Sequence, residues 1–492
     1  MHRDGICTPL SSLKTKESQG IGGFLDLILF FDLIKKVRFN FVQLLPLNDS
    51  GFDNSPYNAI SNLAFNPVYI SIPSLNLLDE EKAEIQNLNE EKRVRYREVL
   101  TLKLKILKRI YRHLSCKEKE EVYAFYLKNQ PLKTYSIFKR MKEILNDQPI
   151  NFFPKEYFDP SFQEGFFERE KEACLFFFFL QKWCHDQLKI ATDYAKKLNI
   201  ELLCDLPILV SQDSVEVFEY PQFFDFTHVA GAPHNAFNSE GQYWGFPLYR
   251  FDEIKKSNYL MWKLRFDVMD HYFSHFRIDH ILGFFRLFSI PKGSKPIHGK
   301  FIPKEEKAAI VEGEEHLHQI LKHTKMIPIG EDLGKKFHGV DEVLKKLKIA
   351  QTKIIQFEKD KNHFIPLDHY PKYSIVSLSN HDLFPFQSFW NHYCENHSSL
   401  LEIFNLKSSI DRFSFQFEIL KKFHQIPCFY RVNPIQEYLH LESCYTPADL
   451  DEDRINYPGE INQTNWTYFL PVKLETLIEN EEWIRKLNQL TQ

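Results

Sequence analysis

The chain has 492 residues, a formal net charge of −4 and 26% charged residues. That length can bury a large core, and the small negative charge excludes the basic surface with which proteins bind nucleic acids. The eight cysteines are scattered without a CxxC pair, which favours free thiols in a reducing cytoplasm over a disulfide framework. The N-terminus lacks the apolar core of a signal peptide, and the most apolar uninterrupted run, residues 173–180, is too short to cross a membrane.

Short apolar runs that end in polar residues recur along the chain, with helix-like segments between them. The predicted strands are residues 5–8, 39–47, 201–209, 276–279, 326–331, 353–357, 374–382 and 427–431. The predicted helices include residues 24–37, 180–198, 259–275, 339–347 and 410–424. Alternating strands and helices imply parallel strands, so eight such units predict an α/β protein with a closed (β/α)8 TIM barrel.

A barrel of this type takes about 250 residues, so roughly half of the chain should be insertions and a C-terminal tail. Residues 77–165 are rich in Glu, Lys, Arg and Leu at helical spacing, which predicts a mainly helical inserted subdomain with a solvated charged face. The chain shows no repeats or low-complexity linkers. We therefore expect residues 1–492 to form a single catalytic barrel with inserted subdomains.

Active sites of TIM barrels lie at the C-terminal ends of the strands. In the predicted barrel this rule selects Asp205, Asp279, Glu331 and Asp382, with His381 directly before the last. Carboxylates that converge on one mouth repel one another, so at least one of them should be driven toward the protonated form. One ionised acid beside one neutral acid is what glycoside chemistry requires.

The residues around two of these acids suggest their roles. Arg277 and His280 flank Asp279, so we expect a lowered pKa and an ionised carboxylate, which suits a nucleophile. Glu331 follows Gly330 and has the longer side chain, so it is the better candidate for the proton donor. The next residue, an aspartate, should point elsewhere.

A structural explanation competes with this one. Aspartates at strand-to-helix turns often cap helices, and an acid between two cations is also typical of a salt bridge. Glu331 is a poor helix cap, which favours a functional role there, whereas Asp332 is a candidate cap. For Asp205 the two explanations are even, because it could simply position the Asp279 region.

Ordered motifs along the chain resemble the 4-alpha-glucanotransferases (amylomaltases, or disproportionating enzymes), which are relatives of the alpha-amylases. The motifs are LPL at 45–47, SPY at 55–57, CDLPI at 204–208, QDSVEV at 212–217, GQYWGFPLY at 241–249, RIDH at 277–280, GEDLG at 330–334, NHD at 380–382, RINYPG at 454–459 and NW at 465–466. Each motif is modestly specific. In this order over nearly the whole chain they are hard to reach by chance.

The resemblance implies a retaining 4-alpha-glucanotransferase with three catalytic acids. Asp279 would be the nucleophile and Glu331 the acid/base, and Asp382 would stabilise the distorted sugar in the transition state. The substrate-binding residues that it implies are Tyr57, Asp205, Gln242, Trp244, Arg277 and His381. Of these, Gln242 and Trp244 would belong to an acceptor-side loop insertion at residues 230–260.

The implied partners are alpha-1,4-glucans, with a maltooligosaccharide or glycogen as the donor and glucose or another glucan as the acceptor. The nucleophile and the acid/base of a retaining enzyme should lie about 5–5.5 Å apart. No metal or organic cofactor is expected, because the His and Cys residues lack ligand spacing. Two alternatives remain: an amylase-like hydrolase that uses water as acceptor, and a non-catalytic glucan-binding barrel, against which the three acids argue.

Two segments depart from the family pattern. Relatives usually carry Pro-Pro-Asp-Tyr-Phe in the acceptor-side loop, where this chain has Asn235 and Ala236 in place of the acid and the ring. After the third acid, relatives often continue Leu-Pro-Thr-Leu-Arg, whereas this chain continues Leu-Phe-Pro-Phe and ends on Gln387. Neither change touches the three acids, so we expect an active enzyme with a shifted chain-length preference.

Overall fold

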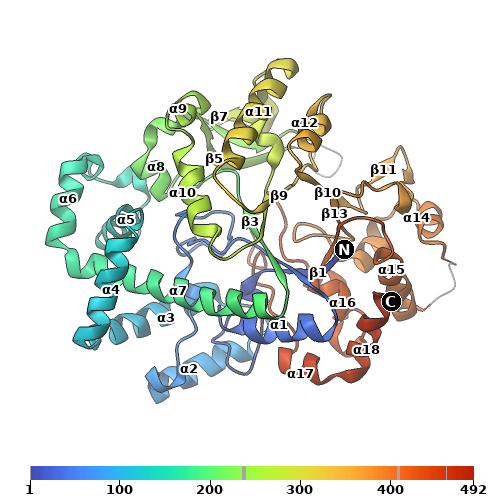
Figure 1. Ribbon diagram of the computed structural model, residues 1–492, viewed down its shortest axis with the longest axis horizontal. Helices are drawn as coiled ribbons and strands as arrows, with labels where there is room; N and C mark the ends of the chain where they lie inside the picture. The colour runs from blue at the N-terminus through green and yellow to red at the C-terminus, as the bar shows by residue number, and fades with distance from the viewer. Residues whose placement is uncertain (1, 235–239, 407–410, 461, 492) are drawn as a thin grey trace.

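A closed barrel of eight parallel strands forms the centre of the computed structural model, which describes residues 2–234, 240–406, 411–460 and 462–491 (Figure 1). The strands follow one another around the barrel in the order β1-β14-β13-β10-β9-β6-β3-β2. They are β1 (Arg3–Thr8), β2 (Phe41–Leu44), β3 (Glu201–Leu206), β6 (His275–Ile278), β9 (Ile327–Gly330), β10 (Ala350–Ile354), β13 (Ser374–Ser377) and β14 (Tyr430–Pro434). The predicted (β/α)8 barrel is confirmed, and each of its strands lies within a few residues of its predicted position.

Strand β6 shows how the alternation of side chains along the sequence corresponds to the two faces of the barrel wall. Successive side chains of a strand point to opposite faces, so Phe276 packs outward against Phe266 of a covering helix, with ring centroids 5.0 Å apart. Arg277 faces the barrel interior, where it bonds to Asp205 of the neighbouring strand. All four residues of the strand are buried, as expected where helices cover one face and the barrel fills the other.

The five predicted helices occur as α1 (Asp26–Lys36), α7 (Lys171–Lys197), α10 (Leu260–Met269), α12 (Val340–Lys346) and α15 (Arg412–Phe423). Helix α15 begins after Asp411, whose side chain accepts hydrogen bonds from the backbone N–H groups of Phe413 and Ser414. The first residue predicted for this helix, Ile410, lies outside the described residues. Helix α7 starts nine residues before its predicted start. The prediction missed this first part because four consecutive phenylalanines, residues 176–179, are all buried and show no helical periodicity in the sequence.

Five further α-helices between β2 and α7 lie together on one side of the barrel (left in Figure 1). They are α2 (Asp79–Glu90), α3 (Tyr96–Arg112), α4 (Cys116–Lys128), α5 (Leu132–Ile144) and α6 (Pro160–Arg169). Helices α4 and α5 pack against α7, which in turn contacts β3. Helix α7 is thus covered on two faces, which explains its continuous apolar run.

A four-stranded antiparallel sheet, in the order β5-β4-β7-β8, stands beside the barrel mouth. Its strands are β4 (Phe224–Ala232), β5 (Gln242–Tyr249), β7 (Leu287–Pro291) and β8 (Lys300–Ile302). The region 230–260 covers the end of β4, all of β5 and α9 (Phe251–Lys256). Asn235, Ala236 and Phe237, where the sequence departs from the family pattern, lie outside the described residues.

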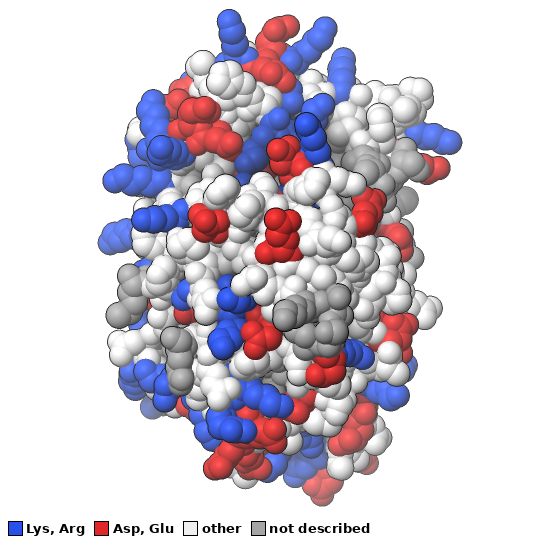
Figure 2. Space-filling view, turned by 90° about the vertical axis from the view of Figure 1, so that its right-hand side faces the viewer, with Lys and Arg blue, Asp and Glu red and all other residues white. Residues whose placement is uncertain are grey.

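The remaining helices and strands include one long helix, α11, and several shorter elements. They are α8 (Val215–Glu219), α11 (Glu306–Leu321), β11 (Lys359–Asp360), β12 (His363–Phe364), α13 (Phe386–Ser388), α14 (His397–Phe404), α16 (Ile435–Leu439), α17 (Leu474–Glu479) and α18 (Glu481–Leu490). Among the helices in the described parts of the chain, none combines the length and apolar character that a bilayer crossing requires. In the face shown in Figure 2, acidic and basic side chains are interspersed toward the top and the bottom, and uncharged residues predominate between them.

Candidate active site

Two adjacent strands bring Asp279 and Glu331 to the same end of the barrel. Ile278 of β6 and Gly330 of β9 are partners in the parallel register, and each acid is the next residue of its chain segment. The backbone N–H of Glu331 donates to the carbonyl of Ile278 at 2.9 Å, and Ile281 donates to the carbonyl of Glu331 at 3.0 Å. The two loops are therefore tied together at the C-terminal mouth of the barrel, where TIM barrels perform their chemistry.

Arg277 links two of the predicted acids below this mouth. Its Nη1 donates to both oxygens of Asp205, at 2.7 and 2.6 Å, and to Oδ1 of Asp279 at 3.1 Å. The hydroxyl of Tyr57 donates to Asp205 Oδ2 at 2.8 Å. The Asp205 carboxylate is completely buried, so it acts as an anchor that fixes both Arg277 and Tyr57.

The expected lowering of the Asp279 pKa was wrong. Burial of the carboxyl raises its pKa to about 8, and the positive charge of Arg277 opposes this only in part. The negative charges of Asp205, Glu331 and Asp382 act in the same direction as burial. Because Arg277 is already paired with Asp205, its charge is shared and cannot hold Asp279 in the ionised form alone.

His280 does not supply the second cation that the sequence suggested. Burial lowers the pKa of its imidazole, so the ring is neutral at pH 7 and adds no positive charge beside Asp279. Its backbone has another function. The residue adopts a left-handed conformation (φ 48°), and its N–H donates to Oε2 of Glu331 at 2.8 Å.

The Glu331 carboxyl is fixed by the backbone on both sides. In addition to the bond from His280, Oε1 accepts a hydrogen bond from the N–H of Leu333 at 2.9 Å. Two donors from two different segments leave the side chain little rotational freedom. Glu331 is therefore oriented without using any of the charged side chains of the mouth.

Asp332 points away from Glu331, as expected for the adjacent residue. Its carboxylate accepts bonds from the backbone N–H of Thr352 at 2.9 Å and from Lys336 Nζ at 2.7 Å. The suggestion that Asp332 caps a helix was wrong, because these partners belong to β10 and to the loop before α12. Its role is to join β9 to β10 behind the active site.

Asp382 is held from the C-terminal segment of the chain. Its Oδ1 accepts a bond from Asn456 Nδ2 at 2.7 Å, and its carbonyl accepts one from Arg454 Nη2 at 2.7 Å. His381 Nε2 lies 3.5 Å from Asp382 Oδ2. Asn456 and Arg454 both lie in the RINYPG motif, which is the one signal in the sequence that points to them.

An aromatic group packs behind His381. The ring of Tyr57 stacks on His381 with centroids 5.2 Å apart and an angle of 22° between planes. Trp466 contacts both rings, at 5.3 Å from Tyr57 and 5.5 Å from His381. In the sequence, only the NW motif at 465–466 points to Trp466. These ring contacts restrict the movement of the His381 and Tyr57 side chains next to the acids.

Gln242 and Trp244 reach the mouth from β5. The Trp244 ring meets His280 edge-on, with centroids 4.9 Å apart and planes at 86°. Its Nε1 donates to Gln242 Oε1 at 2.8 Å. Both residues are half-buried, so they lie between the antiparallel sheet and the loop that carries Asp279.

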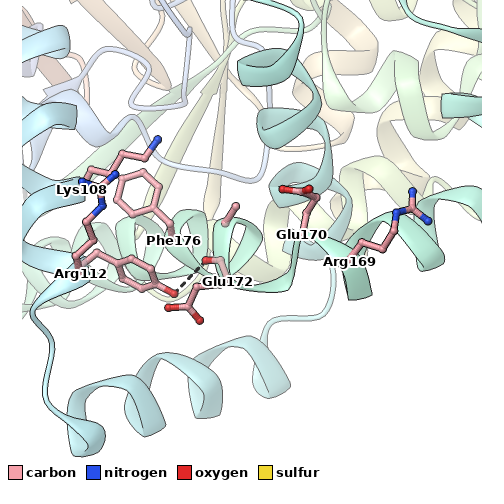
Figure 3. Close-up of a pocket in the computed structure, with 8 residues that line it drawn as sticks. Lys108, Arg112, Arg169, Glu170, Glu172 and Phe176 are labelled. Carbon is pink, nitrogen blue, oxygen red and sulfur yellow. Dashed lines mark hydrogen bonds between the residues drawn. The ribbon is translucent and has the colours of Figure 1, made fainter.

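Two cavities among the described residues lie in different parts of the molecule, one inside the barrel and one among the helices beside it. A small cavity of about 30 Å³ lies below the acids and is lined by Arg277, His381 and other barrel residues, which is room for one water molecule. A larger cavity of about 340 Å³ lies between α3 and α7 (Figure 3). In that view Lys108 and Arg112 lie beside Phe176, and no residue of the barrel mouth contributes.

The model of the 4-alpha-glucanotransferase family matches residues 8–474 of this chain. The chain belongs to the 4-alpha-glucanotransferase family. The 4-alpha-glucanotransferase of Chlamydia caviae is 34% identical over 495 residues, which cover 98% of this chain and 93% of the relative. That of Chlamydia pneumoniae is 35% identical over 493 residues, which cover 96% and 92%.

The solved structures agree with the family assignment at the level of the fold. The amylomaltase from Streptococcus agalactiae in complex with acarbose superimposes with a TM-score of 0.83 at 21% identity, covering 100% of this chain and 99% of that one. The family acts on alpha-1,4-glucans and is a retaining one. The expectation of a 4-alpha-glucanotransferase on a TIM barrel is thus confirmed, and the alternative of a non-catalytic barrel is wrong.

Proposed function

We propose that this 4-alpha-glucanotransferase works by a double displacement in which Asp279 is the nucleophile, Glu331 the acid/base and Asp382 the third acid. The observation that supports this most directly is the register of β6 and β9, which places Asp279 and Glu331 side by side at one barrel mouth. A pair of carboxyl groups about 5–5.5 Å apart is the arrangement that favours retention of configuration.

In the first half-reaction, ionised Asp279 attacks the anomeric carbon of the donor glucan. The bond between that carbon and the glucosidic oxygen breaks, and Glu331 donates its proton to the oxygen. The products are a glycosyl ester on Asp279 and a shortened glucan with a free 4-hydroxyl. In the second half, ionised Glu331 removes the proton of an acceptor 4-hydroxyl, which displaces Asp279 and restores the alpha configuration.

The raised pKa of Asp279 bears on this scheme because only the ionised carboxylate can attack the anomeric carbon. Burial and the neighbouring negative charges oppose that ionisation, whereas the positive charge of Arg277 favours it. The contact between Arg277 and Asp279 therefore supports the role of Asp279 as nucleophile.

Asp382 and the surrounding side chains complete the site. Its carboxylate, held by Asn456, would face the positive charge that develops on the sugar ring in the transition state. Arg277 and His381 would bind the sugar at the cleavage position, and Tyr57 would pack against it. We keep Asp205 in the substrate-binding set through its anchoring of Arg277 and Tyr57 rather than through direct contact.

Gln242 and Trp244 would serve the acceptor side. Their mutual hydrogen bond and the contact of Trp244 with His280 bring them within reach of a glucan that approaches the Asp279 ester. Transfer exceeds hydrolysis only when a sugar acceptor occupies this side and water is excluded. We propose maltooligosaccharides or glycogen as donors, and glucose or another glucan as acceptors.

The departure at Gln387 has a structural counterpart in this chain. The Gln387 side chain is buried, accepts a bond from Arg412 Nε at 2.8 Å and donates to the Arg412 carbonyl at 3.1 Å. It joins the segment after Asp382 to the start of α15. Any shift in chain-length preference would therefore come from the repositioning of this segment and not from a contact of Gln387 with glucan.

We also propose that the enzyme works in the cytoplasm. Cys7, Cys174, Cys184, Cys204, Cys394 and Cys428 are buried free thiols, and Cys116 and Cys444 are exposed free thiols. Proteins with many unpaired thiols are typical of reducing compartments.

Incubation with maltotriose tests the proposed function. Longer maltooligosaccharides that appear together with glucose support transfer, whereas glucose and maltose alone would show a hydrolase. Asp279→Ala is the matched control, because it removes the nucleophile and should abolish both products while glucan binding persists. Anomeric NMR of the first products should show the alpha configuration, and an initial beta product would contradict the double displacement.

A further inference from the structure

Arg454 contacts Asp382 and the residue that holds it. Its Nη2 donates to the carbonyl of Asp382 at 2.7 Å, and its Nε donates to the carbonyl of Asn456 at 2.9 Å. Asn456 in turn donates from its side chain to Asp382 Oδ1 at 2.7 Å. The guanidinium of Arg454 therefore fixes the backbone of Asp382. It also fixes the position of Asn456, whose side chain orients the Asp382 carboxylate.

The guanidinium is itself held between two aromatic rings. Its central carbon lies 4.1 Å from the centroid of Phe384 and 4.0 Å from that of Tyr457. Phe384 stacks on Tyr393, with centroids 4.3 Å apart and planes at 16°. Within the described parts of the chain, no acidic side chain forms an ion pair with Arg454, so ring faces take the place of a carboxylate.

One of the two rings that hold Arg454, that of Phe384, is a departure of this chain from the family pattern. The pattern common among relatives places a proline two residues after the third acid, whereas this chain has Phe384 there. A proline could not offer the ring face that covers the guanidinium. The departure from the family pattern therefore coincides with the contact that fixes Arg454.

We propose that Arg454 is a positioning residue of the transfer reaction, which holds the Asp382 carboxylate in line with the reacting sugar through Asn456 and through the Asp382 backbone. The inference rests on the proposed role of Asp382 as the third acid. A carboxylate that must meet a charge in the transition state loses its effect when it moves, and a displacement of about 1 Å can cost up to 100-fold in rate.

The first test compares Arg454→Ala with Arg454→Lys in the disproportionation of maltotriose. Loss of positioning should lower kcat about 10- to 100-fold and change KM less than about threefold, because substrate contacts are retained. Lysine keeps the charge and can donate to one carbonyl, so Arg454→Lys should recover a large part of the loss. A kcat for Arg454→Ala within twofold of the wild type would overturn the inference.

The second test asks whether Arg454 acts through Asp382. Asp382→Asn alone should lower kcat by at least about 100-fold, as loss of an electrostatic stabiliser does. In the Asp382→Asn background, Arg454→Ala should cost less than about twofold, because a positioning residue has nothing left to position. An equal loss in both backgrounds would overturn the inference. An Asp382→Asn enzyme with normal kcat would instead overturn the proposed function.

Two further variants keep the test decisive. Arg286 is the matched control, since its guanidinium lies 4.3 Å from the centroid of Phe301 and 4.0 Å from that of Phe337 but contacts none of the catalytic acids. Arg286→Ala should leave kcat within twofold. If Arg454→Ala does not fold, Phe384→Leu tests the inference in its place. This variant removes one of the two rings that contact the Arg454 guanidinium and keeps the guanidinium itself. A loss of at least fivefold in kcat supports the inference, and an unchanged kcat overturns it.

Discussion

The guanidinium of Arg277 binds both oxygens of the Asp205 carboxylate, at 2.6 and 2.7 Å, in the interior of the barrel. The same nitrogen reaches Asp279 only at 3.1 Å. Asp205 thus takes the larger share of the positive charge of Arg277. The balance between these two contacts determines how easily the Asp279 carboxyl ionises, and several measurable consequences follow from it.

The first consequence is a pH dependence. Since the pKa of Asp279 is raised to about 8, the nucleophile of the free enzyme gains its charge as the pH rises toward that value. We predict that kcat/KM for maltotriose rises between pH 6 and 8 with an acid limb near 8. A profile that is flat from pH 6 to 8 would contradict this assignment.

Removal of the Asp205 carboxylate, which competes with Asp279 for Arg277, should shift the acid limb of the pH profile. Asp205→Asn eliminates a negative charge that raises the pKa of Asp279 and frees Arg277 for the nucleophile. The acid limb of kcat/KM should therefore shift to lower pH. The variant should also unfold more easily, by about 3–5 kcal/mol, because a buried cation loses its partner. Urea titration measures the second effect independently of the first.

The stability of Asp279→Asn should depend on pH with a definite sign. The folded-state pKa of Asp279 is higher than the value in an unfolded chain, so its stabilising contribution is complete at about pH 4 and is lost as the pH rises through about 8. An asparagine cannot ionise and escapes this loss. We predict that the variant matches wild type near pH 4 and is more stable by at least about 1 kcal/mol at pH 8.5. Thermal unfolding across this range checks the prediction.

Glu331→Gln should separate the two half-reactions. With maltotriose its kcat should fall by about 10³-fold, because neither the proton donor nor the later base remains. With alpha-maltosyl fluoride, whose leaving group needs no proton, the variant should release one equivalent of fluoride per active site and then stop. Asp279→Asn, treated in the same way, should release none. A fluoride burst from the Asp279 variant would exclude it as the nucleophile.

Tyr57→Phe isolates the hydrogen bond to Asp205 from the stack on His381. Loss of a bond to a buried carboxylate should cost about 1.5–3 kcal/mol of unfolding free energy. The ring remains, so kcat should fall only a few-fold. Tyr57→Ala also removes the stack and should raise KM much more. Equal KM values for the two variants would show that the ring face does not bind sugar.

The amino-acid sequence determined the barrel and the location of its acids. Strands buried on both faces read as apolar runs, and the C-terminal ends of parallel strands meet at one mouth, so Asp279, Glu331 and Asp382 could be placed there from the sequence. Asp205 was expected there as well, but it lies within β3 and its carboxylate is buried in the barrel interior. The direction of Asp332 also followed from chain geometry alone. Each of these inferences needs only the period of a strand and its polarity.

The tertiary structure alone decided the electrostatics and the supporting contacts. Arg277 stands two residues from Asp279 in the chain, yet it pairs more closely with Asp205, 72 residues away. Asn456 reaches Asp382 from 74 residues away. A pKa depends on burial and on every charge that converges on the group from other strands, and neighbours in the sequence reveal only a small part of that set.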